Sequence, residues 1–157
     1  MSESKLSHIN DKGQANMVDV SGKTESARIA TASGKLITTY EVLKAISEGN
    51  NPKGDVLATA RIAGIMAAKK TSELIPLCHP IAIHKVDIDL KVESDGIAIL
   101  ATVKTSDRTG VEMEALTAVS VAGLTLIDMV KAADPKAKII NIQVESKSGG
   151  KNGDWKR

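Results

Sequence analysis

The sequence predicts an α+β fold in which an antiparallel sheet carries helices on one of its faces. Segments 86–92 and 97–103 carry apolar residues at every second position, and Asp95-Gly96 between them is typical of a tight hairpin turn. Segment 109–131 is long and mostly apolar, with the period of a helix. The full order of strand, helices, strand, strand, helix and strand is the split βαβ order of a ferredoxin-like sandwich.

The first elements follow from their boundary residues. We expect a strand over 28–33, although its alternation is weak. Thr38 and Glu41 fit a capping box, which starts a helix that runs through Ile46 and has Gly49 at its C-terminal cap.

The next elements complete the sandwich. A second helix runs from Asp55, whose side chain suits an N-cap, to about Lys70. Segment 75–80 is a rigid loop between two prolines, and segment 140–144 alternates as the last strand. The helices leave one face of the sheet uncovered, and its polar positions allow it to meet water or another subunit. These positions are Asp87, Asp89, Asn141 and Gln143.

The long helix carries charged residues at both ends. Thr109 and Glu112 fit a capping box at its start, and Pro135 ends it because the residue before a proline leaves the helical region. Asp128 lies in an otherwise apolar run, where an unpaired carboxylate is costly, and Lys131 lies three residues on, on the same face. A core helix with one structural ion pair and a helix with chemistry at both ends fit this pattern about equally well.

Three other segments carry groups suited to an anionic ligand. Lys53 precedes a helix N-terminus, where free N–H groups and the helix dipole favour anions; the alternative is a solvated loop lysine. His79, beside Cys78, is a candidate phosphate or proton partner, and the alternative is an ordinary loop histidine. Lys147 and Lys151 flank two glycines and suit a segment that closes over phosphates, with a disordered basic tail as the alternative.

Length and composition indicate a single domain over residues 1–157, with 42% hydrophobic and 25% charged residues as in a soluble globular protein. The polar segment 1–16 and the glycine-rich segment from about 148 to 157 are expected to be mobile. A net charge of +2 and only two aromatic residues argue against a nucleic-acid or membrane partner. No apolar run long enough for a bilayer and no signal peptide is recognised, so we expect a cytoplasmic protein. The single cysteine excludes an internal disulfide and a cysteine metal cluster.

Five sequence runs can be compared with known families. They are Met-Val-Asp-Val (17–20), Lys-Gly-Asp-Val-Leu-Ala-Thr-Ala-Arg-Ile-Ala-Gly-Ile (53–65), Ile-Pro-Leu-Cys-His-Pro (75–80), Thr-Gly-Val-Glu-Met-Glu-Ala-Leu-Thr-Ala (109–118) and Lys-Ser-Gly-Gly-Lys (147–151). These runs resemble the cyclic pyranopterin monophosphate synthase family, and they occur in the family's order with no departure at a functional position. The similarity extends from about Leu6 to Asp154.

The resemblance implies a lyase, the second enzyme of molybdenum cofactor biosynthesis, which forms homohexamers as trimers of dimers on a ferredoxin-like fold. Its substrate is a 3′,8-cyclised dihydro-GTP, and its products are cyclic pyranopterin monophosphate and diphosphate. By motif, the proposed catalytic residues are Asp128, Lys53 and Lys131. The residues that match substrate-contacting segments are Leu77, Cys78, His79, Met113 and Glu114.

The implied reaction rearranges rings and closes a cyclic phosphate, which requires proton transfer and charge stabilisation without redox change. We therefore expect no tightly bound cofactor and no protein-bound metal, while Mg²⁺ accompanying the triphosphate stays open. Lys53, His79 and Lys147 suit the triphosphate, and either Glu112 or Glu114 reads the guanine-derived edge.

Two further expectations concern function and assembly. A non-catalytic ligand-binding module on the same sandwich is the competing function, and it predicts that Asp128→Asn costs nothing beyond stability. Glu114 and Asp128 lie 14 residues apart, roughly 21 Å along a helix at 1.5 Å per residue, so we expect sites shared between subunits.

Overall fold

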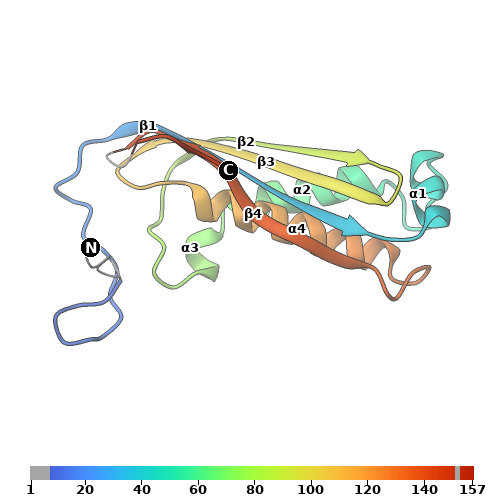
Figure 1. Cartoon of the computed structure of the whole chain (residues 1–157), viewed down its shortest axis with the longest axis horizontal. Coiled ribbons are helices and arrows are strands. Elements are labelled where there is room, and N and C mark those ends of the chain that lie inside the picture. The colour runs from blue at the N-terminus through green and yellow to red at the C-terminus, as the bar shows by residue number, and fades with distance from the viewer. Residues whose placement is uncertain (1–7, 151–152) are drawn as a thin grey trace.

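The computed structural model describes residues 8–150 and 153–157. Five strands form one antiparallel sheet in the order β2-β3-β1-β4-β5, and the helices lie on one face of it (Figure 1). This arrangement confirms the predicted α+β ferredoxin-like sandwich. The elements are β1 (Ser26–Ile37), α1 (Tyr40–Ser47), α2 (Val56–Ala68), α3 (Thr71–Leu74), β2 (Ile83–Val92), β3 (Gly96–Asp107), α4 (Glu112–Val130), β4 (Lys138–Ser148) and β5 (Trp155–Lys156).

The core lies between the sheet and the helix pair α2 and α4. The alternating residues of the hairpin are buried as predicted, because one face of each strand packs on the helices. Gly64 of α2 lets the two helices approach closely, since a Cβ there would lie 2.9 Å from the Ala118 carbonyl oxygen of α4. The buried hairpin residues are Ile88, Leu90, Ile97, Ile99, Ala101 and Val103.

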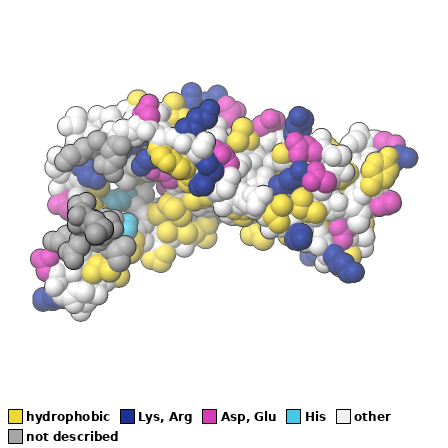
Figure 2. Space-filling model, in the orientation of Figure 1, with side chains coloured by type: hydrophobic (Ala, Val, Ile, Leu, Met, Phe, Trp, Pro, Cys, Tyr) yellow, Lys and Arg dark blue, Asp and Glu magenta, His cyan; other side chains and the backbone are white. Residues whose placement is uncertain are grey.

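The outer surface of the helix layer keeps several large apolar side chains exposed. Ile62 and Met66 of α2 and Leu124 of α4 are more than half exposed. Hydrophobic side chains gather on this side of the molecule, below the sheet (Figure 2). Residues 8–150 and 153–157 therefore leave an apolar surface on this layer uncovered.

Two predicted helix starts are wrong. The N-cap of α1 is Thr39, whose side chain accepts from the Val42 N–H, whereas the Thr38 hydroxyl donates to the Asp134 carboxylate over 2.8 Å. α4 begins at Glu112 itself, after Val111, and has no side-chain cap, so the Thr109 capping box does not form. At α1, the contact with Asp134 takes the Thr38 hydroxyl away from the helix start, and the next threonine forms the cap instead. The Asp55 cap of α2 is confirmed by its bond to the Ala58 N–H.

Several elements differ in extent from the sequence prediction. β1 and β4 are longer than predicted, because pairing with neighbouring strands extends them beyond the alternating segments. β5 lies within the C-terminal segment expected to be mobile, and it pairs with Ser146 and Lys147 of β4. Contrary to expectation, α4 is long and apolar enough to cross a membrane by length and composition; half of its apolar window is buried, as in the core helix of a globular domain.

Candidate functional site

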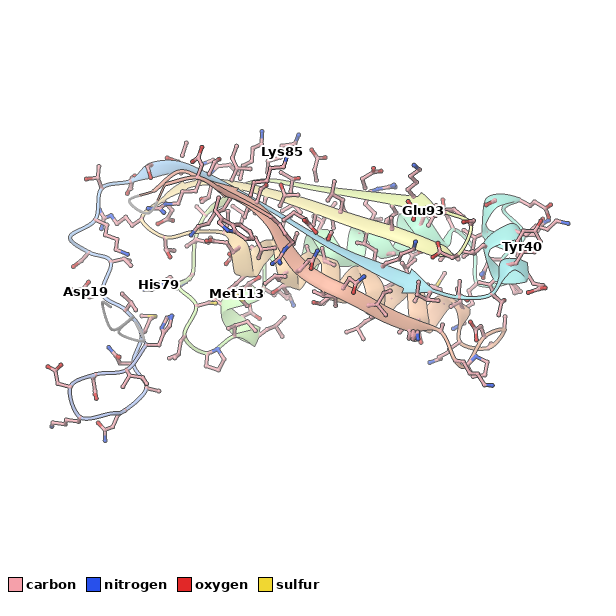
Figure 3. All side chains as sticks on the ribbon, in the orientation of Figure 1. Asp19, Tyr40, His79, Lys85, Glu93 and Met113 are labelled. Carbon is pink, nitrogen blue, oxygen red and sulfur yellow. The ribbon has the colours of Figure 1, made fainter. Side chains whose placement is uncertain are left out.

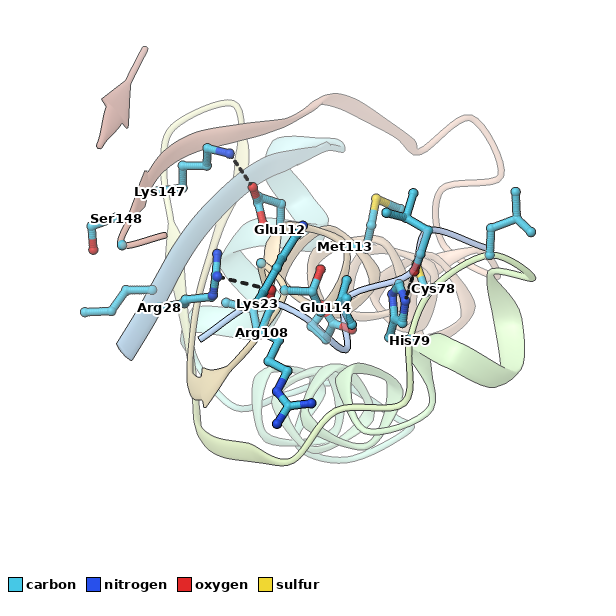
Figure 4. A pocket seen from close by; sticks show the side chains of 18 of the residues that line it. Lys23, Arg28, Cys78, His79, Arg108, Glu112, Met113, Glu114, Lys147 and Ser148 are labelled. Atoms are coloured by element: carbon cyan, nitrogen blue, oxygen red, sulfur yellow. Dashed lines mark hydrogen bonds and ion pairs between the residues drawn. The ribbon is translucent and has the colours of Figure 1, made fainter. Parts of the chain in front are cut away.

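A pocket of about 510 Å³ lies at the N-terminal end of α4 (Figure 4). Its walls come from five segments that are distant in the sequence and that the sheet and helix packing bring together. They are the N-terminal segment (Val18, Val20, Lys23), the start of β1 (Arg28, Ile29), the loop Leu77, Cys78 and His79, the turn and first helical residues from Arg108 to Glu114, and the end of β4 (Lys147, Ser148, Gly149).

Basic side chains outnumber carboxylates around this pocket. Four basic residues line it against Glu112 and Glu114, so the pocket has an excess of positive charge. Arg28 is fixed by donating to the carbonyl oxygens of Asp107 (2.9 Å) and Arg108 (3.1 Å). This charge balance favours an anionic ligand. The four basic residues are Lys23, Arg28, Arg108 and Lys147.

Glu112 faces Lys147 across the pocket, at 2.9 Å between carboxylate and ammonium (Figure 4). A Cβ on Gly110 would overlap this carboxylate, so the glycine leaves room for Glu112 to turn toward β4. Glu112 is therefore an ion-pair partner inside the pocket, and the capping role expected for it is wrong.

Glu114 is the buried carboxyl of the pocket, with only 3% of the residue exposed. Burial raises its pKa from 4.5 to about 7, and the neighbouring charge of Glu112 adds to this, while a bond from its own backbone N–H acts in the opposite sense. Near neutral pH this carboxyl is protonated part of the time. It can then both donate and accept hydrogen bonds, which suits recognition of a polar ring edge.

The loop between α3 and β2 supplies His79 and Cys78. Nε2 of His79 lies 2.7 Å from the Val18 carbonyl oxygen, which can only accept, so Nε2 carries the proton and Nδ1 is an acceptor in the neutral ring. Burial raises the pKa of the Cys78 thiol, which disfavours the nucleophilic thiolate. His79 and Met113 lie toward the end of the molecule away from Tyr40 (Figure 3).

A second cluster lies at the C-terminal end of α4. Lys131 donates to the Asp128 carboxylate over 2.7 Å, and Lys53 lies 3.7 Å from the other carboxylate oxygen and donates to the Asp128 backbone carbonyl over 2.5 Å. The hydrogen bond and charge of Lys131, followed by the charge of Lys53, lower the pKa of Asp128. Asp128 is therefore an ionised carboxylate between two cations.

This second cluster is open to water, which the sequence did not predict. The side chains of Asp128 and Lys131 are each 59% exposed, and that of Lys53 is 41% exposed. Although Asp128 lies in an apolar run of the sequence, its carboxylate remains largely exposed to water in this chain.

The structure thus divides the predicted site residues into two groups. Leu77, Cys78, His79, Glu112, Met113, Glu114 and Lys147 line the pocket, whereas Lys53, Asp128 and Lys131 form the exposed cluster. The 14 residues between Glu114 and Asp128 correspond to about 21 Å of helix, and α4 is continuous between them. One chain therefore does not bring the groups together. Lys151 lies outside the described residues.

Three pocket cations were not identified from the sequence: Lys23, Arg28 and Arg108. Arg28 and Arg108 meet because β1 pairs with the end of β3, a contact across about 80 residues. Of the three, only Arg28 carries a local sequence signal of a site. By strand alternation it lies on the same inward face of β1 as Ala30. A cation on an inward strand position is unusual unless it lines a site.

Among residues 8–150 and 153–157, no three His, Cys, Asp or Glu side chains gather as a metal site. The absence of a protein-bound metal stays a prediction.

Known proteins resemble this chain along nearly its whole length. The MoaC family matches residues 17–150. A Streptomyces avermitilis protein is 59% identical over 155 residues, which cover 99% of this chain and 91% of that protein. A Nocardioides protein is 58% identical over 156 residues (98% and 96%), and a Mycobacterium tuberculosis protein is 58% identical over 152 residues (97% and 91%). The first two are named cyclic pyranopterin monophosphate synthase, and the third cyclic pyranopterin monophosphate synthase 2.

Proposed function

This chain belongs to the MoaC family, and we propose that it is the lyase that converts (8S)-3′,8-cyclo-7,8-dihydroguanosine 5′-triphosphate into cyclic pyranopterin monophosphate and diphosphate. Family membership over residues 17–150 carries this proposal, because the residues named above for the pocket and for the exposed cluster fall within that range. The competing binding-module function has no specific observation in its favour.

The pocket at the start of α4 supports a role in holding the nucleotide-derived substrate. Its volume falls within the range typical of small-molecule sites, roughly 300–1,000 Å³. Lys23, Arg28, Arg108 and Lys147 are the groups we assign to the triphosphate. Glu114 is the group we assign to the guanine-derived edge, because its raised pKa lets it donate as well as accept. Glu112 is engaged by Lys147 and is the weaker candidate for this edge.

The cluster at the end of α4 supplies an acid and a base side by side, which supports a role in proton transfer. Asp128 is ionised and accepts protons, while Lys131 and Lys53 donate them or stabilise negative charge. Closing the cyclic phosphate requires a substrate hydroxyl to lose its proton as its oxygen bonds to the α-phosphorus. Diphosphate then leaves from that phosphorus with the bonding electrons, and nearby cations stabilise its charge.

We further propose a homohexamer, a trimer of dimers, whose sites are shared between subunits. The separation of about 21 Å between the two groups supports this, since it is too long for one substrate to contact Glu114 and Asp128 of the same helix. The exposed apolar residues of the helix layer suit an isologous contact in which α4 of one subunit runs antiparallel to α4 of its partner. Two equal sites per dimer would follow.

Under the same proposal the protein acts in the cytoplasm, without a tightly bound cofactor and without a nucleic-acid or membrane partner. Mg²⁺ is compatible with it as a companion of the substrate triphosphate.

The direct test is turnover. The purified protein is incubated with the cyclised dihydro-GTP, and diphosphate release is measured together with the fluorescent pterin formed after oxidation. We expect both products in equal amounts, and none from unmodified GTP as the control. Diphosphate release no faster than in a protein-free blank would refute the proposal.

A further inference from the structure

The pairing of β4 with β1 contains two irregularities, one between Ser33 and Lys35 and one just before Lys147. The second bears on the pocket. Ala32 of β1 pairs with Val144, but Thr31 pairs with Ser146, so Glu145 is an extra residue with no partner on β1. This is a β-bulge, in which two residues of one strand face one residue of its neighbour.

The bulge changes the side of the sheet on which Lys147 lies. Ala30 and Ala32 of β1 are buried toward the helices. On β4, Val144 pairs with Ala32 and Lys147 pairs with Ala30, and paired residues lie on the same face of a sheet. Val144 and Lys147 are three residues apart, so a regular strand would place them on opposite faces. With the extra residue both face the helix layer, and Lys147 reaches Glu112 across the pocket.

The side chain of Glu145 is held on the outer face of the sheet. One carboxylate oxygen accepts from the Ser33 hydroxyl over 2.5 Å and from the Gln143 amide over 2.8 Å. The first of these bonds joins the bulge to β1, and the second joins it to the preceding part of β4. These bonds also lower the pKa of Glu145.

The other edge of the bulge is bonded to Arg157, the residue directly after β5. The Arg157 N–H donates to the Glu145 carbonyl over 2.8 Å, and Arg157 Nε donates to the Val144 carbonyl over 3.1 Å. Trp155 of β5 pairs with Lys147 itself. The bulge is therefore fixed from both neighbouring strands.

We propose that Glu145 is a positioning residue: its bonds to Ser33 and Gln143 hold the bulge that turns Lys147 into the pocket. Loss of these bonds frees β4 to pair without the extra residue. Ser146 would then pair with Ala30, and Lys147 would pair with Ile29 on the outer face, away from Glu112.

The test compares Glu145→Ala with Glu145→Gln, whose amide oxygen can accept the same two bonds. The control is Glu93→Ala, which removes another carboxylate held by a hydrogen bond, in this case from Lys35 at 2.8 Å. Each full-length variant is treated with formaldehyde and a borane reductant, and methylation of every lysine is followed by peptide mass spectrometry. The thermal midpoint of each variant is recorded in parallel.

We expect Glu145→Ala to raise the methylation rate of Lys147 severalfold relative to the other lysines, with little change for Glu145→Gln and Glu93→Ala. An unchanged rate in Glu145→Ala would overturn the proposal, and so would an equal rise in Glu145→Gln. A rise at all lysines together with a lower midpoint would indicate general destabilisation and would also overturn it.

A kinetic arm rests on the proposed function. Glu145→Ala should lower kcat/KM about tenfold in the wild-type background but hardly at all in Lys147→Ala, because coupled residues give non-additive effects. Full additivity would contradict action through Lys147. If the wild-type chain shows no turnover, the proposed function fails, while the methylation result still decides the role of Glu145.

Discussion

Lys131, at the C-terminal cap of α4, donates a 2.7 Å hydrogen bond to Asp128 one turn before it, and both side chains remain 59% exposed. The pair is thus formed by the helix alone, without burial in this chain. An exposed pair contributes little to folding, so its chemistry and its stability can be tested separately.

Asp128→Asn should lower turnover at least about a hundredfold, because the amide cannot accept the proton that a carboxylate base takes. Diphosphate release measures this loss, and circular dichroism should show an unchanged fold. Asp87→Asn is the matched control, since Asp87 is also an exposed carboxylate paired with a lysine, Lys85. Wild-type turnover in Asp128→Asn would remove Asp128 from the mechanism.

Lys131→Met should lower activity strongly while the thermal midpoint hardly changes. The apolar run around Asp128 in the sequence predicts a loss of stability as well, because Lys131→Met leaves the carboxylate unpaired. The exposure of Asp128 in the structure removes that expectation. Lys44→Met provides the control, as Lys44 belongs to an exposed helical pair with Glu48. A large drop in midpoint for Lys131→Met alone would mean that Asp128 is buried in the assembled protein.

Glu114 should make the protein less stable as pH rises. Its folded-state pKa of about 7 lies above the ordinary value of 4.5, so the folded chain binds this proton more tightly than the unfolded chain. The free energy of unfolding therefore falls between about pH 4.5 and 7 and then levels off.

Glu114→Gln removes this titration. The thermal midpoint of the variant minus that of the wild type should therefore be larger at pH 8 than at pH 5. Glu112→Gln, which loses the Lys147 ion pair, should show no such gain. A midpoint difference that is the same at both pH values would contradict the raised pKa.

Sites shared between subunits predict complementation. Inactive Asp128→Asn and Glu114→Ala proteins, mixed under conditions of subunit exchange, should regain activity because some sites receive both intact residues. Exchange is verified with differently tagged chains. A mixture that stays inactive despite exchange would place the complete site within one chain.

Treatment with EDTA should leave the folded enzyme active once the chelator is removed and Mg²⁺ is restored with the substrate. Elemental analysis of the treated and untreated protein gives the metal content. A stoichiometric transition metal lost together with activity, and not replaced by Mg²⁺, would contradict the expected absence of a protein-bound metal.

The sequence alone determined the fold class and the local pairs. The alternation in the hairpin and the period of the long helix predicted the sandwich, because a half-buried strand and a helix bury one face each. The spacing of Asp128 and Lys131 predicted their pair, since residues three apart are neighbours on a helix. The Asp55 cap was predictable for the same reason: the groups that form it are close in sequence.

Only the tertiary structure decided which groups meet across the chain. Thr38 bonds Asp134 instead of capping α1, and Glu112 meets Lys147 instead of capping α4, because distant partners compete with local ones. The burial of Glu114 depends on the loops packed around it, which no local period encodes. That Lys147 faces the same side as Val144 depends on the unpaired Glu145 between them, and register is a property of two strands together.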